Sequence, residues 1–395
     1  MDRSIKKSIS INEFTYILNL NKVSDAERSS LIPILFENPS ARKTFLLREN
    51  IRTLDKLEKA ITSIISNKDA VESVKSIFFI NDDLFIPPEI KRIFSDNTKI
   101  AFFVGAGVSK LLKIPLWEEL ADRAIEYLRD NHYINYGEWS KLKSDKSSFK
   151  QKLSIFHQVV KDDPALEKFY KEKLQAKSNE IDNPYRLFCD LEQAINKPVL
   201  KISTNIDQEW EKILEEKSGK EKTIISEEGE ETIIPSSYES TQFSDFSREQ
   251  ELSEKILYQI HGSLKLFETT IITTAEYVDN YRDERKLKGF LEEVFRNYSV
   301  IFIGSGIQEF EILEHCLKIS PNEHFALLGT YIDDENLFRV KEKYFAELKI
   351  KTIRYYLDFQ GYDRLLFLLK NWCQEIKSSR KKGFYDDLKL IDEVL

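Results

Sequence analysis

The sequence predicts an α/β protein built on a Rossmann-like, doubly wound parallel sheet. Short apolar runs rich in β-branched and aromatic residues recur along the chain, and such runs are typical of strands buried on both faces. In the second half of the chain these runs alternate regularly with helical patterns, which indicates a parallel sheet covered by helices on both faces. Several runs also end in a glycine turn or a polar cluster, as strands do where an open α/β sheet binds ligands. The predicted strands are 100–104, 199–202, 256–261, 300–303, 324–328 and 350–356.

The composition describes a globular chain without an evident membrane or nucleic-acid partner. The 395 residues are 41% hydrophobic and 32% charged, and the formal net charge of −8 gives no general attraction to a polyanion. No apolar run approaches the roughly 20 residues that a membrane-spanning helix needs. Since the amino terminus also lacks a hydrophobic signal core, we expect a cytoplasmic protein with no membrane association and no direct nucleic-acid binding.

The three cysteines argue against a structural metal site. Cys189, Cys316 and Cys373 lie far apart in the sequence and form no CxxC pair. This spacing is typical of a reducing compartment and not of a zinc ribbon. We therefore expect each cysteine to be a small buried hydrophobic residue and expect no metal.

The chain divides into three predicted parts. Residues 1–90 contain no glycine and carry apolar residues at helical spacing, which predicts a helical packing or oligomerisation module that ends near Pro87-Pro88. Residues 91–377 carry the strand pattern and form the predicted catalytic domain, with a helical insertion at about 116–195. Residues 378–395 are expected to be a peripheral tail.

The first candidate motif is the glycine turn after the predicted strand 100–104. Its candidate ligand-binding residues are Gly105, Ala106, Gly107 and Ser109. A strand, a glycine turn and a helix bring backbone N–H groups toward a phosphate, and a Cβ at the turn would keep the backbone away from the ligand. A dinucleotide fingerprint would place a third glycine where Lys110 stands, so a simple tight turn is the alternative interpretation.

The second candidate motif follows the predicted strand 199–202. Thr204, Asn205 and Asp207 come directly after it, at the edge where parallel strands bind ligands. An Asx turn with a helix cap would explain one of these residues but not all of them. Thr204, Asn205 and Asp207 are therefore all candidate site residues.

Two further motifs end predicted strands. His261 is followed by Gly262, and it is either a core histidine whose hydrogen bonds are satisfied or a general base that faces the cleft. The strand 300–303 runs into Gly304, Ser305 and Gly306, which form a second candidate ligand-binding turn.

Taken in order, these motifs resemble the sirtuin superfamily over roughly residues 98 to 375. The motifs that carry the resemblance are Gly105–Ser109, Asn205–Asp207, His261-Gly262 and Gly304–Gly306. The resemblance implies a sheet that binds NAD as its substrate and a reaction that begins with cleavage of the nicotinamide–ribose bond. It implies no cofactor beyond NAD and, given the cysteines, no zinc.

The resemblance also implies a role for each motif. Gly105–Ser109 would cradle the pyrophosphate, and Gly304–Gly306 would approach the adenosine ribose. Asn205 would hold the nicotinamide ribose and order the attacking water, while Asp207 would contact the carboxamide. His261 would be the base that acts through a ribose hydroxyl. Elementary chemistry agrees with these residue types, because glycosidic cleavage builds positive charge on the sugar and nicotinamide leaves without a strong general acid.

Differences from the usual sirtuin motifs indicate which branch of the superfamily the chain resembles. Protein deacylases of this kind carry four zinc-binding cysteines that this chain cannot supply, and their Pro-Asp-Phe-Arg segment is replaced by Pro115–Glu118. The motifs, with the stretch Thr273–Tyr277, look more like bacterial sirtuin-like effectors that hydrolyse NAD during antiphage defence. The size of the chain is most similar to the stand-alone effector that pairs with a HerA-family DNA-translocating ATPase. That likeness implies a homo-oligomer with such an ATPase as partner.

The predicted function is therefore an NAD glycohydrolase that releases nicotinamide and ADP-ribose and depletes NAD upon activation. One alternative is a sensor that binds NAD or an ADP-ribose-type nucleotide without turning it over. Another is an NAD-dependent protein deacylase or ADP-ribosyltransferase.

Overall fold

The computed structural model describes residues 24–36, 39–49, 51–78, 85–161, 163–176, 183–218, 222–225, 231–234, 239–242, 252–282, 287–305 and 321–394. The chain forms two compact units. The larger comprises residues 86–328, 344–353 and 369–395, and the smaller comprises residues 1–85, 329–343 and 354–368.

A parallel β-sheet organises the chain, and the predicted α/β fold class is confirmed. Its strands are β1 (Ile100–Val104), β2 (Val199–Ser203), β5 (Glu239–Gln242), β6 (Ile256–Gln259), β7 (Ser299–Ile303), β8 (His324–Thr330) and β9 (Ile350–Tyr356). They form a seven-stranded sheet in the order β5-β6-β2-β1-β7-β8-β9. From β1 the chain passes to β2, to the edge strand β5 and back to β6 on one side, and then crosses to add β7, β8 and β9 on the other. Apart from β5, this is the order of a doubly wound Rossmann-like sheet, whose ligand crevice lies where the direction reverses.

The register of the central strands places their carboxyl ends side by side. Val104 at the end of β1 pairs with Ser203 of β2 on one side and with Ile303 of β7 on the other. The segments that follow these three strands therefore leave the sheet at one edge. These segments are the turns that the sequence predicts to bind a ligand.

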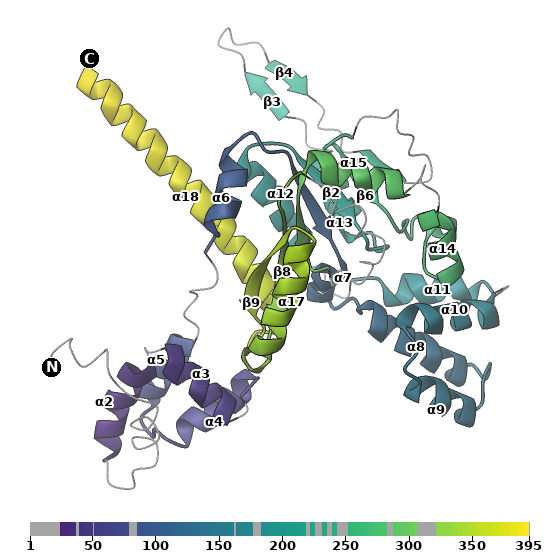
Figure 1. The fold of residues 1–395 in the computed structure, drawn as a ribbon, viewed down its shortest axis with the longest axis horizontal. Helices are drawn as coiled ribbons and strands as arrows, with labels where there is room; N and C mark the ends of the chain where they lie inside the picture. Colours follow the sequence, from purple (N-terminus) through teal and green to yellow (C-terminus); the bar gives the residue numbers. More distant parts are fainter. Residues whose placement is uncertain are drawn as a thin grey trace. The chain divides into compact units, whose positions relative to one another are not determined.

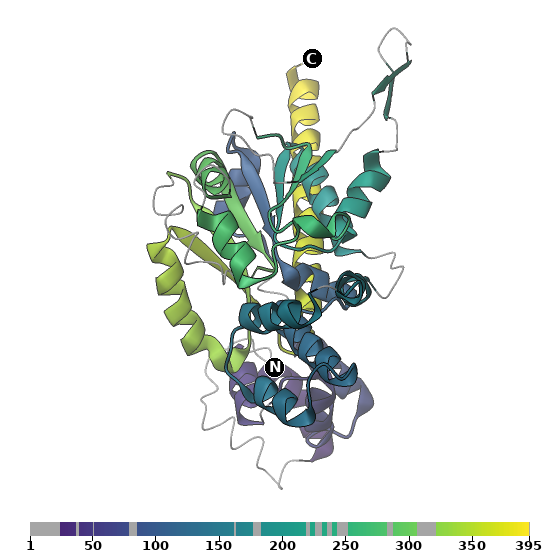
Figure 2. The same ribbon diagram turned by 90° about the vertical axis from the view of Figure 1, so that its right-hand side faces the viewer.

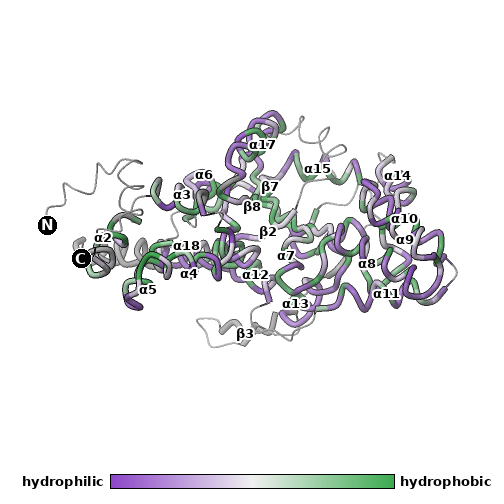
Figure 3. The backbone as a smooth tube through the Cα atoms, turned by 90° about the horizontal axis from the view of Figure 1, so that it is seen from below, coloured by the Kyte–Doolittle hydropathy of each residue, from purple (hydrophilic) through white to green (hydrophobic). Residues whose placement is uncertain are grey.

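Helices cover both faces of the sheet, and every residue of the central strands β1, β2 and β7 is buried (Figures 2 and 3). Ala101 and Phe103 of β1 share a buried cluster with Phe290 and Val294 of helix α15 (Gly289–Asn297). The intervening Phe102 points the other way and contacts the ring of Phe188 of helix α12 (Pro184–Ile195), with centroids 5.8 Å apart. Alternate residues of one buried strand thus fill two separate cores.

The helical insertion between β1 and β2 is confirmed. Its members are α8 (Trp117–Asp130), α9 (Tyr136–Ser144), α10 (Phe149–Val160), α11 (Ala165–Lys173) and α12 (Pro184–Ile195), which follow the short segments α7 (Ala106–Ser109) and η2 (Lys110–Leu112). The remaining helices of the larger unit include α6 (Pro88–Ser95), α13 (Glu209–Ser218), α14 (Thr274–Arg282) and α15 (Gly289–Asn297). Helices α17 (Glu335–Glu347) and α18 (Asp363–Val394) follow β8 and β9, and α18 is the long helix labelled at the carboxyl end in Figure 1.

The smaller unit contains the helices predicted for the first 90 residues. They are α2 (Asp25–Phe36), α3 (Pro39–Arg48), α4 (Leu54–Thr62) and α5 (Lys68–Phe78). Phe36 packs on Phe45 and on Phe78 with ring centroids 4.9 Å apart in both pairs, and the later residue Phe359 packs on Phe78 at 6.2 Å. Residues that follow β9 therefore complete this core. The predicted domain boundaries at 90 and 377, and an oligomerisation role for this module, stay predictions.

Three local features complete the description of the chain. Residues 274–297 contain two helices, α14 and α15, whose ends are separated in the sequence by residues 283–288. Between α13 and β5, the strands β3 (Lys222–Ile225) and β4 (Glu231–Ile234) pair in the antiparallel direction. Residues 378–394 continue helix α18. No helix among the described residues is both long enough and apolar enough to span a bilayer.

Candidate active site

Two glycine turns interlock at the carboxyl ends of β1 and β7. The N–H of Gly105 donates to the carbonyl of Ile303 over 3.0 Å, and the N–H of Gly107 donates to the carbonyl of Gly304 over 2.7 Å. A Cβ on Gly105 would lie 2.6 Å from the Cα of Ser305, and one on Gly107 would lie 2.8 Å from the Gly304 oxygen. Glycine is thus required here because two turns of the chain approach each other, and the N–H groups of Gly105 and Gly107 are already bonded within the protein.

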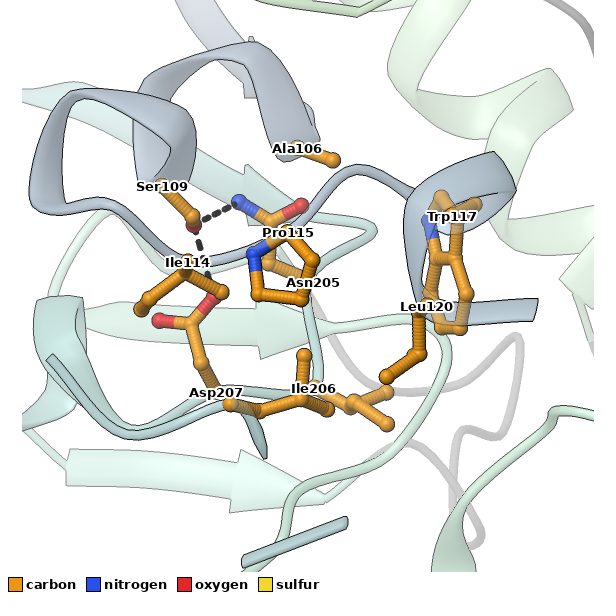
Figure 4. Close-up of a pocket in the computed structure, with 10 residues that line it drawn as sticks. Ala106, Ser109, Ile114, Pro115, Trp117, Leu120, Asn205, Ile206 and Asp207 are labelled. Atoms are coloured by element: carbon orange, nitrogen blue, oxygen red, sulfur yellow. Dashed lines mark hydrogen bonds between the residues drawn. The ribbon is translucent and has the colours of Figure 1, made fainter. Parts of the chain in front are cut away.

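A pocket opens beside the glycine turn at the ends of β1 and β2 (Figure 4). It is lined by Ala106, Ser109, Ile114, Pro115, Trp117, Leu120, Leu174, Asn205, Ile206 and Asp207. Residues 106–120 supply one wall through the loop that joins α7 to α8. Glu119 holds this loop, because its carboxylate accepts from the N–H of Leu116 at 3.1 Å and from the ammonium of Lys110 at 2.6 Å. The pocket is mostly apolar and carries an amide, a hydroxyl and a carboxylate on one side.

Asn205 lies where β2 ends and is 4% exposed. Its Nδ2 is within hydrogen-bond distance of the Gly105 carbonyl at 3.0 Å, the Ser109 hydroxyl at 2.9 Å and the Tyr185 hydroxyl at 2.9 Å. The Gly105 carbonyl can only accept, so it fixes which end of the amide faces the turn. The Oδ1 of Asn205 is buried and has no hydrogen-bond partner among the described residues. In Figure 4 this oxygen points away from Ser109.

Ser109 and Asp207 form a short hydrogen bond in the same pocket. The Ser109 hydroxyl donates to Oδ2 of Asp207 over 2.6 Å, and Oδ1 of Asp207 accepts from the N–H of Glu209 at 3.1 Å. Burial raises the pKa of Asp207 from 3.8 to about 6, although the hydrogen bond from Ser109 acts in the opposite direction. This carboxyl group therefore changes charge close to neutral pH.

Tyr185 is a functional candidate that the sequence reasoning missed. It is fully buried at the start of α12, and its hydroxyl contacts both the Asn205 amide and, over 2.8 Å, the Ser109 hydroxyl. In the sequence it is one aromatic residue on an amphipathic helix and looks like any core tyrosine. Only its hydroxyl contacts distinguish it.

His261 lies at the end of β6 and is 0% exposed. Its Nδ1 lies 3.0 Å from the carbonyl oxygen of Thr204, which can only accept, so Nδ1 carries the proton. Its Nε2 then accepts from the hydroxyl of Tyr281 at 3.0 Å. Tyr281 stacks on Tyr277, with centroids 5.7 Å apart, so His261 lies among aromatic residues of α14. Both ring nitrogens are hydrogen-bonded in this conformation.

The structure brings most of the predicted site residues to one edge of the sheet. Ala106, Ser109, Asn205 and Asp207 line the pocket, while Gly105, Gly107, Gly304 and Ser305 form the interlocked turns beside it. The carbonyl of Thr204, at the end of β2, is hydrogen-bonded to His261, and His261 does not line the pocket. Gly306 lies outside the described residues. Among the described residues, no group of His, Cys, Asp and Glu side chains is arranged to hold a metal ion.

Comparison with known proteins relates this site to sirtuins. A family model described as a SIR2-like domain matches residues 199–353, which include Asn205, Asp207 and His261 but begin after the Gly105 turn. The chain is 25% identical over 253 residues to "Defense-associated sirtuin 2" of Bacillus subtilis, an alignment that covers 63% of this chain. The chain spans only 22% of the length of that relative. The two matches support a sirtuin-like protein whose residues 199–353 are similar to a SIR2-like domain.

Proposed function

We propose that this protein hydrolyses NAD, with water as co-substrate, to nicotinamide and ADP-ribose. The observation that carries the proposal is the amide of Asn205, a residue that lines the pocket and whose buried side-chain oxygen has no hydrogen-bond partner among the described residues. A buried polar atom without a partner is costly in a folded protein, and a bound ligand or water relieves that cost. An amide oxygen suits this reaction because it accepts from a ribose hydroxyl or from a water molecule.

The reaction separates charge in a way that the other pocket residues support. The C1′–N bond of the nicotinamide riboside breaks, its electron pair leaves with neutral nicotinamide, and the positive charge moves onto the ribose. Water then adds to C1′ and releases one proton. The dipole of Asn205 and the carboxylate of Asp207 favour the cationic sugar, while the apolar side chains around Trp117 limit access of bulk water.

His261 is proposed as the base that acts through a ribose hydroxyl. With Nδ1 protonated toward Thr204, Nε2 is the basic nitrogen. In the conformation described, Tyr281 donates to that nitrogen, so proton transfer requires this hydroxyl to move or to relay the proton. Gly105–Ser109 and Gly304–Gly306 are proposed to hold the rest of the dinucleotide, with Thr204 beside them.

A role in antiphage defence is part of this proposal. It rests on the name of the Bacillus subtilis relative and on the sequence resemblance. NAD depletion on activation, a homo-oligomeric state, pairing with a HerA-family ATPase and a cytoplasmic location are likewise proposed.

The second candidate function is a sensor that binds NAD or an ADP-ribose-type nucleotide without cleaving it. The burial of His261 and the engagement of both its nitrogens favour this candidate, because the described residues that line the pocket include no histidine, lysine or arginine. Incubation of the purified chain with NAD, alone and with the protein encoded by the neighbouring gene, separates the two. Hydrolysis predicts nicotinamide and ADP-ribose in equal amounts, and tight binding without nicotinamide under every condition would favour the sensor.

A further inference from the structure

We propose that Tyr185 is a positioning residue that works with Ser109 as a hydroxyl clamp on the Asn205 amide. The clamp keeps the amide nitrogen toward the glycine turn and the amide oxygen toward the pocket. This inference rests on the proposed function, since it assigns a residue to the same reaction.

The clamp follows from counting donors and acceptors around Asn205. Its Nδ2 carries two hydrogens and has three acceptors, at 2.9 to 3.0 Å, in the Gly105 carbonyl and the hydroxyls of Ser109 and Tyr185. One hydrogen goes to the carbonyl, and the other is shared between the two hydroxyl oxygens. Removal of one hydroxyl leaves this second hydrogen a single acceptor and holds the amide less firmly, and removal of both leaves the hydrogen without an acceptor.

The hydrogen bonds run in one direction through the cluster. Ser109 donates its single proton to Asp207, so its oxygen accepts from Asn205 and from Tyr185. Tyr185 in turn accepts from Asn205 and donates to Ser109. Burial keeps the pKa of Tyr185 well above 10, so this hydroxyl retains its proton. Each polar hydrogen of the cluster therefore has an acceptor.

Tyr185 is itself held firmly, as a positioning residue must be. Its backbone N–H donates to the side chain of Asn183 at the start of α12, over 3.0 Å. Its ring stacks on Trp210 of α13, with centroids 5.5 Å apart and planes 25° from parallel. The helices that precede and follow β2 in the sequence thus together fix the hydroxyl that contacts Asn205.

A double-mutant cycle on the full-length chain tests the clamp. Tyr185→Phe and Ser109→Ala each leave one hydroxyl for the second hydrogen, so each is expected to lower kcat for nicotinamide release about tenfold with little change in KM. The double variant leaves that hydrogen unpaired and is expected to lose more than the product of the two single losses. Tyr170→Phe is the matched control, because Tyr170 is also fully buried but its hydroxyl contacts His157.

Two results would overturn the clamp while leaving NAD hydrolysis intact. One is a Tyr185→Phe protein that has the kcat of the wild type. The other is a loss of kcat in the control Tyr170→Phe that equals the loss in Tyr185→Phe. If the wild type releases no nicotinamide, the proposed function fails and the clamp is judged from crystal structures of both single variants and the double variant. If the side-chain amide of Asn205 is displaced, or adopts two orientations, in the structure of the double variant, the clamp is supported. An Asn205 side chain that is unchanged there refutes it.

Discussion

The amide nitrogen of Asn205 donates to the main-chain carbonyl of Gly105 over 3.0 Å, across 100 residues of sequence. This bond joins the end of β2 to the glycine turn after β1. It also sets the orientation of the Asn205 amide, whose oxygen has no hydrogen-bond partner among the described residues.

Replacement of Asn205 by Ala is expected to abolish nicotinamide release while the protein stays folded. The substitution removes a well-bonded nitrogen but also an unpartnered buried oxygen, so the free energy of unfolding should fall by only about 1–2 kcal/mol. Urea denaturation and product chromatography measure the two effects. Asn131→Ala, at an exposed helix end, is the matched control for loss of an asparagine and should retain full activity. A fully active Asn205→Ala protein would exclude Asn205 from the chemistry.

Asp207 is expected to make stability fall as pH rises through the acidic range. Its pKa is raised to about 6 in the folded protein, so between about pH 4 and pH 6 the folded state holds a proton that the unfolded state has lost. The free energy of unfolding should therefore decrease over this window by up to about 3 kcal/mol, and Asp207→Asn should remove the decrease. Urea denaturation from pH 4 to pH 7 measures this, with the exposed Asp279→Asn as control. If the free energy of unfolding depends on pH in the same way in the wild type and in Asp207→Asn, the pKa of the Asp207 carboxyl group is not raised in the folded protein.

His261 is best tested against His324, which is the other fully buried histidine in the part of the chain that the structure describes. Asn in place of His261 can keep the bond to the Thr204 carbonyl but has no counterpart of Nε2, so we expect at least a hundredfold loss of nicotinamide release. His324 accepts from the N–H of Val300 at 3.1 Å, and burial lowers its pKa to about 3, so its role is structural. His324→Asn can preserve that acceptor and should stay active. Equal activity in the two variants would remove His261 from the mechanism.

Gly304 is expected to be intolerant of any side chain. Its φ of +63° is a left-handed conformation, and a Cβ would lie 2.6 Å from the N atom of Val108. Gly304→Ala should therefore lower stability by roughly 2–4 kcal/mol, because strain and a backbone clash add together. Gly361 provides the control, since its φ is +55° but a Cβ there meets nothing within 4 Å. Thermal unfolding should show a much smaller loss for Gly361→Ala, and similar losses would mean that the interlocked turns are not rigid.

The fold class and the polar residues of the pocket could be predicted from the sequence, because buried strands and their polar ends have local signatures. Ser109, Asn205 and Asp207 lie within five residues of the ends of β1 and β2, and parallel pairing brings such positions together. The reason for the glycines was not predictable, since the contact of Gly105 with Ser305 joins turns about 200 residues apart. Tyr185 was missed because its helix pattern is that of a core residue. The hydrogen-bonding partners of His261 could not be predicted either, because Thr204 and Tyr281 approach it only in the folded chain.

The most direct test is a crystal structure of the chain with a carbocyclic NAD analogue that cannot be cleaved. We expect the nicotinamide end to enter the pocket beside Trp117, with Oδ1 of Asn205 within hydrogen-bond reach of the sugar analogue or of a water molecule next to its C1′ position. An analogue that binds elsewhere, or that leaves Oδ1 of Asn205 without a partner, would refute the proposed site.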